Sequence, residues 1–236
     1  MSAAAGPDIV KNGLVFHVDP SDLKCYSGGS ICRDLTRING NGTLNDITFS
    51  SDKAFQMNGS ESSVINFTRS YTNVANQHTF VAMVLCPDIV NLYGSAYFLQ
   101  SLNPSFGGLT MGFYTVGGNS TGFQLYGATD NLSSYNDGNY IGPSSELLNR
   151  IIICHGIMSG NTTKIYINQF LRSTTTQGGS GSINIQNVIK LGFEDVAFLP
   201  TEAGLKIYKA MIYNRALTDR EVLQNYNAMK GRARLS

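Results

Sequence analysis

The sequence predicts an all-β protein, either a sandwich or a barrel, with one short helix near the C-terminus. Runs of apolar and β-branched residues recur at roughly ten-residue spacing, with turn residues between them. Only 14% of the 236 residues are charged, and polarity comes from Asn, Ser and Thr beside 25 Gly, as many short strands joined by turns require. One segment, 218–229, has the capping and spacing of an amphipathic helix.

The strand pattern continues without an internal repeat or a break in composition, which indicates one domain over residues 13–229. The segment 78–86, HTFVAMVLC, is apolar on both faces, so we place it in the centre of a sheet. The segment 205–213 is similar, with odd-numbered residues on one face and even-numbered residues on the other. The predicted strands are 13–19, 32–35, 43–49, 54–57, 63–67, 78–86, 97–100, 109–114, 122–126, 150–158, 163–168, 169–173, 188–192 and 205–213.

The segments outside these strands have distinct characters. Residues 1–12 are predicted to be an N-terminal arm that orders on contact with a neighbour. Residues 127–145 form a long polar loop, and loops of that length are usually functional or mobile. Thr218 is the expected N-cap of the helix, with Glu221 completing a capping box. Residues 230–236 are predicted to be a basic tail.

Four segments, in order, resemble laminin-G-like domains of the concanavalin A-like lectin/glucanase superfamily. GPDIVKNGLVFHVDPSDLKCY resembles the opening of members carried by phages, and HTFVAMVLC resembles their long central strand. IIICHGIMSGNTTKIYINQFL resembles the family's hairpin, although Gln169 stands where Gly is usual. IYNRALTDREVLQNYNAMKGR resembles the closing strand, turn and helix. The resemblance implies a concanavalin A-like jelly-roll β-sandwich.

The phage-borne subgroup also implies a function. Such domains occur in tailed bacteriophages as capsid decoration proteins, appendages and fibre components. The resemblance therefore implies a non-enzymatic, homo-oligomeric decoration protein on the virion surface, assembled in the host cytoplasm. Its partners would be the major capsid protein or other virion proteins. The alternative is a receptor-recognition module of a tail fibre or spike that binds host-surface glycans.

Charge and hydropathy argue against other classes of partner. The net charge is +1, so neither nucleic acid nor a membrane surface is expected to attract the chain. No apolar run reaches about 18 residues, and the first residues lack the basic and apolar regions of a secretory signal. Cys86 and Cys154 lie in apolar strands as buried thiols. Cys25 and Cys32 flank a Gly-Gly turn and are either free or a disulfide formed in an oxidising medium.

No catalytic constellation is expected. Glycoside hydrolases need two carboxylates that flank the scissile bond, and the chain lacks the E-x-D-x-x-E spacing of the laminarinase-like branch. Glu194 and Asp195 are adjacent, so on a strand they would point to opposite faces. The three histidines lie in strand patterns without zinc-ligand spacing, and we expect structural roles for them.

The long polar loop supplies the candidate binding site. Sugar sites combine an aromatic platform with amide and carboxylate hydrogen-bonding groups, and this chain has Tyr but no Trp to serve as the platform. The alternative is that the loop packs on the sandwich or contacts a neighbouring subunit. The candidate carbohydrate-binding residues are Tyr126, Asp130, Asn131, Tyr135, Asn136, Asp137 and Tyr140.

Calcium is the one cofactor for which the sequence offers ligands. Asp19, Asp22 and Asp34 cluster around one turn region, and hard cations bind carboxylates and loop carbonyls. They do not match an EF-hand loop, and the alternative is that they are turn-forming residues.

Overall fold

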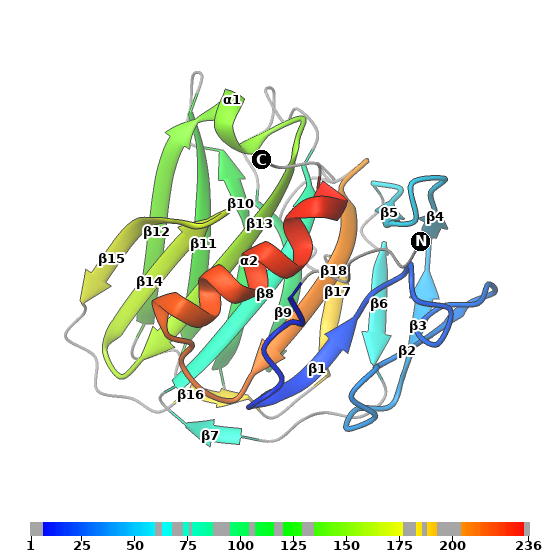
Figure 1. Ribbon diagram of the computed structural model, residues 1–236, viewed down its shortest axis with the longest axis horizontal. Coiled ribbons are helices and arrows are strands. Elements are labelled where there is room, and N and C mark those ends of the chain that lie inside the picture. The colour runs from blue at the N-terminus through cyan, green and yellow to red at the C-terminus, as the bar shows by residue number, and fades with distance from the viewer. Residues whose placement is uncertain are drawn as a thin grey trace.

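The computed structural model describes residues 7–59, 63–67, 73–75, 77–86, 95–103, 107–115, 120–128, 135–176, 183–185, 188–192 and 204–233. Within these residues the chain forms two antiparallel sheets, and helix α2 (Asp219–Ala233) lies across the outer face of one of them (Figure 1). The predicted fold class, an all-β jelly-roll-like sandwich with one short C-terminal helix, is confirmed. No helix in the described ranges is long and apolar enough to cross a membrane.

Sheet A is the sheet that carries α2. Its strands run in the order β15-β14-β13-β8-β18-β5-β4, and β1 pairs with the part of β18 that follows the short β5 pairing. Its described strands are β1 (Leu14–Val18), β4 (Ile47–Phe49), β5 (Phe55–Met57), β8 (Gln77–Leu85), β13 (Ile151–Ser159), β14 (Thr162–Ile167), β15 (Phe170–Thr176) and β18 (Lys206–Tyr213).

Sheet B is the second layer, in the order β12-β11-β10-β9-β17-β6-β3-β2. A one-turn helix, α1 (Ser144–Leu147), follows β12, and a separate ribbon pairs β7 (Asn73–Ala75) with β16 (Ile183–Ile185). The described strands of sheet B are β2 (Ile31–Arg33), β3 (Asn41–Asn45), β6 (Val64–Phe67), β9 (Ser95–Asn103), β10 (Gly107–Thr115), β11 (Ser120–Ala128), β12 (Tyr135–Pro143) and β17 (Lys190–Gly192).

Two apolar clusters hold the layers together. The larger one fills the space between the sheets, and the smaller one lies between sheet A and α2. The central strand β8 contributes to both, because Phe80 and Val84 belong to the sandwich core and Val81 and Met83 belong to the cluster under the helix. Each such buried side chain contributes roughly 1.5–3 kcal/mol. The predicted central position of this strand, apolar on both faces, is confirmed.

Strand β18 departs from strict alternation at a β-bulge. Its register against β8 shifts between Ile207 and Lys209. As a result Ile207 and Ala210 both join the sandwich core, and Tyr208 and Met211 both lie under α2, although each pair is three residues apart. The prediction that odd-numbered residues share one face is therefore wrong across the bulge, because one extra residue turns the strand over.

The predicted strand 43–49 is two strands in different sheets. Strand β3 of sheet B ends at Asn45, and β4 of sheet A begins at Ile47. Asp46 joins them with a φ of 47°, a left-handed conformation that Asp tolerates better than most residues. Its carboxylate accepts hydrogen bonds from Asn58 Nδ2 and Ser63 Oγ, both at 3.1 Å. A continuous strand pattern in the sequence does not reveal a corner of one residue.

The predicted loop 127–145 also needs correction. Its second part is strand β12, which pairs with β11 from Ala128↔Tyr135 to Ser120↔Pro143, followed by α1. The strand is rich in Asn, Asp and Gly, which are depleted in strands. It lies at the edge of sheet B, where one side of the strand needs no partner and polar residues are tolerated. Backbone pairing therefore overrides the local composition.

Both predicted terminal segments are built into the fold where they are described. Val10 is buried, its N–H donates to Asn225 Oδ1 at 2.9 Å, and its carbonyl accepts from Tyr213 Oη at 2.9 Å. The described part of the predicted arm 1–12 therefore contacts α2 and β18 of its own chain. Helix α2 continues to Ala233, so it includes the start of the predicted basic tail. In this part of the helix, Arg232 Nη1 forms an ion pair with Asp19 Oδ1 at 2.5 Å.

Candidate functional site

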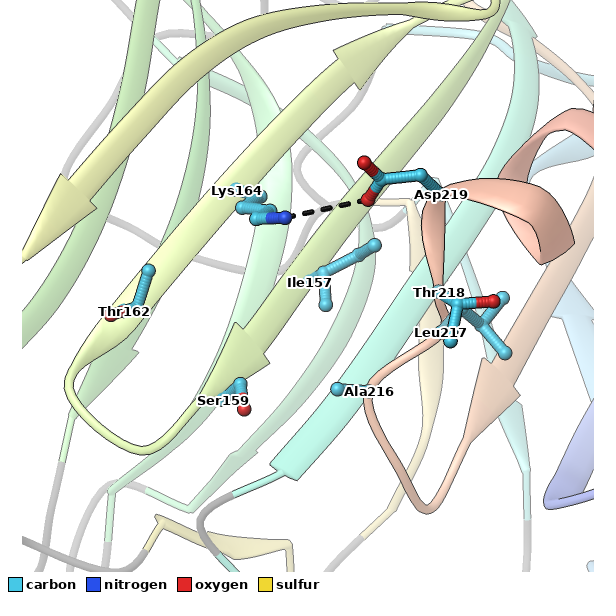
Figure 2. Close-up of a pocket in the computed structure, with 8 residues that line it drawn as sticks. All are labelled: Ile157, Ser159, Thr162, Lys164, Ala216, Leu217, Thr218 and Asp219. Carbon is cyan, nitrogen blue, oxygen red and sulfur yellow. Dashed lines mark hydrogen bonds and ion pairs between the residues drawn. The ribbon is translucent and has the colours of Figure 1, made fainter.

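A hollow of about 500 Å³ lies where α2 begins beside the β13–β14 hairpin (Figure 2). Capping places its helical wall: Thr218 Oγ1 accepts from Glu221 N at 3.3 Å, and Glu221 Oε2 accepts from Thr218 N at 2.9 Å, which is the predicted capping box. The opposite wall is the end of the hairpin. The lining residues are Ile157, Ser159, Thr162, Lys164, Ala216, Leu217, Thr218 and Asp219.

A charged pair spans the hollow. Lys164 Nζ lies 3.3 Å from Asp219 Oδ1, and the same oxygen accepts from Tyr166 Oη at 2.7 Å (Figure 2 shows the Lys164–Asp219 pair). The hydrogen bond from Tyr166, helped by Lys164, lowers the pKa of Asp219. Burial and the neighbouring carboxylate raise the pKa of Tyr166. The carboxylate is therefore ionised at neutral pH, and most of its surface remains exposed.

The lining of the hollow combines polar groups with an apolar surface. Hydroxyl, ammonium and carboxylate groups stand above a floor of Ile157 and Leu217, and the volume lies within the 300–1,000 Å³ typical of ligand pockets. Asp219 is the single carboxylate among the lining residues, whereas glycoside hydrolysis needs two. No His lines the hollow to activate the Ser159 or Thr162 hydroxyl.

The structure places most of the predicted carbohydrate-binding residues on two adjacent strands. Tyr126 is in β11, and Tyr135, Asn136, Asp137 and Tyr140 are in β12. The register sets Tyr126 directly opposite Asp137. The two remaining candidates, Asp130 and Asn131, lie outside the described residues.

Tyr140 packs against the sandwich core, so its side chain faces the opposite sheet. A residue that packs there is poorly placed to meet a ligand on the outer surface of sheet B.

Tyr140 is already engaged within the protein. Its hydroxyl donates to Glu146 Oε2 at 2.6 Å, and the Arg172 guanidinium lies 5.7 Å from the ring centre and pairs with Glu146. Burial, together with the Glu146 carboxylate, raises the pKa of Tyr140. Both the ring and the hydroxyl thus hold helix α1 and strand β15 to the edge of sheet B.

The three calcium candidates have separate partners. Asp19 accepts from Lys209 Nζ at 2.9 Å and Arg232 Nη1 at 2.5 Å. Burial opposes ionisation of Asp19, but the two cations outweigh it and lower its pKa to about 2. Asp34 is buried and accepts from backbone amides of its own turn, and Asp22 accepts from the turn that follows it. In the described part of the chain, no three His, Cys, Asp or Glu side chains could share a metal ion.

Cys154 and His155 face opposite sides of sheet A. Cys154 belongs to the sandwich core, whereas the neighbours of His155 on its own face, Ile153 and Ile157, lie under α2. His155 is fully buried, and burial lowers its pKa to about 3. Its two ring nitrogens make no hydrogen bond to the residues that the structure describes. The pair therefore forms no nucleophile–base arrangement.

The sequence predicts that Thr218 caps the helix, but it contains no signal for the hollow beside this residue. Lys164 and Asp219 are 55 residues apart and meet only because the β13–β14 hairpin lies next to the start of α2. Neither residue has a local signal, since a Lys in a strand and an Asp in a first helical turn are both ordinary. A tertiary contact of this kind has no periodicity to detect.

Known proteins resemble this chain in structure but not in sequence. No family model and no curated protein sequence matches it. The binding domain of Paraclostridial Mosquitocidal Protein 1 aligns with 92% of the chain and 52% of its own, at 15% identity and a TM-score of 0.68. The receptor binding domain of botulinum neurotoxin D aligns with 91% of the chain and 52% of its own, at 13% identity and a TM-score of 0.67.

A sialidase from Trypanosoma rangeli aligns with 94% of the chain and 33% of its own, at 15% identity and a TM-score of 0.61. This chain therefore spans about half, or less, of the length of these structures. At such identities the likeness shows the sandwich fold alone. The laminin-G-like and phage resemblance of the sequence stays a prediction.

Proposed function

We propose that the protein is a non-enzymatic carbohydrate-binding module and that the hollow at the start of α2 is its sugar site. The lining of the hollow carries this proposal. A sugar presents hydroxyls at its rim and apolar C–H groups on its ring faces. The hollow offers Lys164, Asp219 and three hydroxyls as hydrogen-bonding groups around an apolar floor.

The comparisons support the same class of function. Two of the similar structures are binding domains by name, one of them a receptor binding domain. The sialidase was solved in complex with a difluorinated keto-deoxy-nononic acid. A shared fold does not transfer a ligand, so the glycan itself must be found by experiment.

The test is a glycan array probed with the labelled protein, followed by calorimetry on any glycan that binds. Lys164→Ala removes one hydrogen-bonding cation of the hollow, and we expect it to weaken binding about tenfold, equivalent to about 1.4 kcal/mol. Lys206→Ala is the matched control, because Lys206 makes a similar pair with Asp52 at 3.0 Å outside the hollow. We expect that control to bind like the unaltered protein.

Two results would overturn the assignment. If no glycan binds, the carbohydrate-binding proposal fails. If Tyr135→Ala abolishes binding and Lys164→Ala does not, the sugar is held at the β11–β12 edge and the hollow is not the site.

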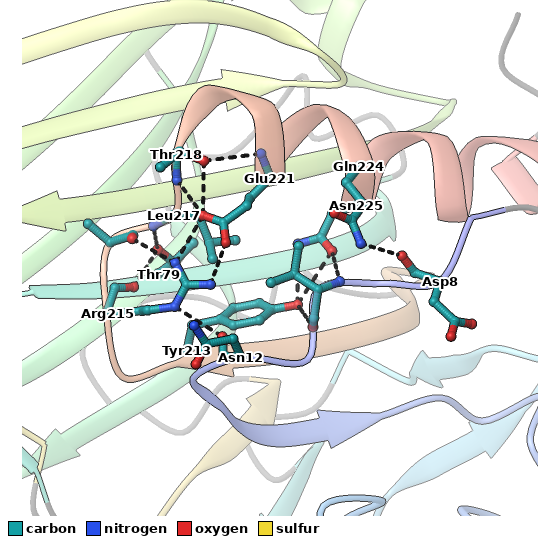
Figure 3. A network of polar contacts seen from close by, with 12 residues as sticks. Asp8, Asn12, Thr79, Tyr213, Arg215, Leu217, Thr218, Glu221, Gln224 and Asn225 are labelled. Atoms are coloured by element: carbon teal, nitrogen blue, oxygen red, sulfur yellow. Dashed lines mark hydrogen bonds and ion pairs between the residues drawn. The ribbon is translucent and has the colours of Figure 1, made fainter.

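We also propose, as a second candidate, that this chain is a structural component of a bacteriophage virion, on the capsid surface as a decoration protein. Two sequence segments that resemble laminin-G-like domains, the opening one in its phage-borne form and the closing one, contact each other in the fold. Arg215 Nε donates to Asn12 O at 3.0 Å, and Gln224 Nε2 donates to Asp8 O at 2.9 Å (Figure 3). The joint placement of the two ends supports the family resemblance from which the virion role follows.

Quantitative mass spectrometry of purified particles tests this role. Hundreds of copies in fixed ratio to the major capsid protein are expected of a decoration protein. A few to a few tens of copies would instead indicate a fibre or spike, where glycan recognition is the main task. Absence of the protein from particles would remove the virion role and leave the sugar proposal standing.

A further inference from the structure

Two buried thiols lie side by side at one end of the sandwich. Cys25 and Cys32 are almost fully buried in the sandwich core, and their side chains are hydrogen-bonded to each other as free thiols. The backbone holds them together as well, because Arg33 N donates to Cys25 O at 2.8 Å. Side-chain and main-chain contacts therefore hold the two thiols next to each other.

The residues between the two thiols form a turn that has free space on its outer side. Gly28 and Gly29 have φ values of 107° and 82°, and no atom lies within 4 Å of a Cβ placed on either. Tyr26 begins the turn, and its hydroxyl donates to Gly29 O at 2.8 Å. The turn thus has room to move outward, while its ends are fixed by the two cysteines.

This turn is one wall of a second hollow. The hollow has a volume of about 270 Å³ and is lined by Tyr26, Ser27 and Gly28 of the turn and by Phe49 of β4. The Tyr26 ring lies 4.9 Å from that of Phe49 and 5.1 Å from that of Phe55, both in sheet A. Cys32 lies in β2 of sheet B. A link between the thiols would therefore tie this wall to the opposite sheet.

We propose that Cys25 and Cys32 are a redox-responsive dithiol, which a small-molecule disulfide such as glutathione disulfide converts to an intramolecular disulfide that locks the 26–30 turn. The inference is independent of the proposed sugar site. The turn that forms one wall of the second hollow would be mobile when the thiols are reduced. It would be fixed when they form the disulfide.

The exchange proceeds in two balanced steps. The Cys25 sulfur attacks one sulfur of the glutathione disulfide, which releases one glutathione thiolate and leaves a mixed disulfide on Cys25. The Cys32 sulfur then attacks Cys25, which releases the second glutathione. The two thiol protons of the protein end on the two glutathione molecules. Exchange of the two roles, with Cys32 attacking first, gives the same product and the same balance.

The other two cysteines serve as an internal control. Cys154 pairs with Ala82, and Leu85, next to Cys86, pairs with Ile151. Cys86 and Cys154 are therefore separated by several steps along the ladder, far beyond the roughly 7 Å between Cα atoms that a disulfide spans. The same oxidant should leave these two thiols free.

The experiment is to refold the full chain in a buffer of reduced and oxidised glutathione, denature it, alkylate it and digest it with trypsin. Cleavage after Lys24 and Arg33 places both cysteines in one peptide, 25–33. We expect this peptide to be unalkylated and about 2 Da lighter than its reduced form. Cys86 and Cys154 should be alkylated. Alkylation of all four cysteines, or glutathione attached to Cys25 and Cys32 singly, would overturn the proposal.

Two further measurements test disulfide formation and the mobility of the turn separately. Cys25→Ser should abolish the light peptide and Cys86→Ser should retain it. If Cys25→Ser does not fold, the result on the unaltered chain still decides the chemistry. Amide exchange of residues 26–30 should slow several-fold on oxidation. Unchanged exchange in a protein that carries the disulfide would refute the locking of the turn.

Discussion

Asp52 and Asp219 accept hydrogen bonds from the same arrangement of neighbours in two distant parts of the fold. Asp219 is held by Lys164 and Tyr166 of β14, at 3.3 and 2.7 Å. Asp52 is held by a lysine and a tyrosine of β18 that are likewise two residues apart, at 3.0 and 2.6 Å. The first arrangement lines the large hollow, and the second does not, so the fold contains its own control for the proposed sugar site.

Tyr166→Phe tests how the carboxylate at the hollow is kept ionised. The hydroxyl of Tyr166 contributes most to the low pKa of Asp219, so its removal should raise that pKa toward 3.8. A lowered carboxyl pKa adds stability that is present above 3.8 and lost as the pH falls, and the variant should lose part of this dependence. Carboxyl chemical shifts measured against pH by NMR report both aspartates. Asp52 should titrate as before, and a shift at Asp52 alone would contradict this account.

His155 should make the protein sensitive to mild acid. Its folded pKa of about 3 lies below the value of about 6.5 in the unfolded chain, so only the unfolded chain takes up a proton as the pH falls from 6.5. Stability is therefore lost below pH 6.5, by about 2 kcal/mol at pH 5 from this group. His155→Leu should remove that loss, measured by urea unfolding at pH 7 and pH 5. Equal losses in both proteins would show that the histidine is not responsible.

Two glycine substitutions should act in opposite directions. Gly231 lies on α2 with open space around a Cβ, so Gly231→Ala should stabilise the protein by about 0.5–1 kcal/mol. Gly192 has a φ of 91°, and a Cβ there would meet Ser63 O at 2.4 Å, so Gly192→Ala should destabilise it by more than the roughly 1–2 kcal/mol of left-handed strain. Thermal unfolding measures both. Gly160→Ala, at a φ of 59° with nothing nearby, isolates the strain alone.

Asn225 should decide whether the N-terminal segment stays on the fold. The side chain is fully buried, accepts from Val10 N and donates to Tyr213 Oη at 3.2 Å. Asn225→Leu leaves the Val10 N–H without its acceptor in an apolar site, at a cost of about 1–3 kcal/mol, whereas Tyr213 Oη keeps its hydrogen bond to Val10 O. Amide exchange at Val10 should rise well above that in the sandwich core. Leu223→Asn, on an exposed part of the same helix, is the control and should leave this exchange unchanged.

What the sequence predicts well depends on how local its cause is. Strand β8 is identified because its residues are apolar on both faces, and the start of α2 because Thr218 and Glu221 are three residues apart. Both signals lie within a few residues of each other. The bulge in β18 and the corner at Asp46 are also short, but they depend on which strand lies alongside and leave no period in the sequence.

The binding candidates show the same limit. The sequence presents the Tyr and Asn residues of β12 as members of a loop, whereas the structure pairs their backbone in register with β11. The sequence does not predict the hollow at α2, because Lys164 and Asp219 acquire a shared role only from the packing of the hairpin against the helix. Composition indicates which kinds of residue could form a site. It does not indicate which of these residues the fold brings together.

The single-residue corner at Asp46 couples the two sheets mechanically. Strand β3 of sheet B ends at Asn45, and strand β4 of sheet A begins at Ile47. The two sheets therefore cannot move far apart at this point unless hydrogen bonds of β3 or β4 break. The sandwich cannot open like two hinged plates at this end. Separation of the sheets at this end requires the pairing of β3 with β6 or of β4 with β5 to break, and the second hollow, which Phe49 of β4 lines, lies beside this connection.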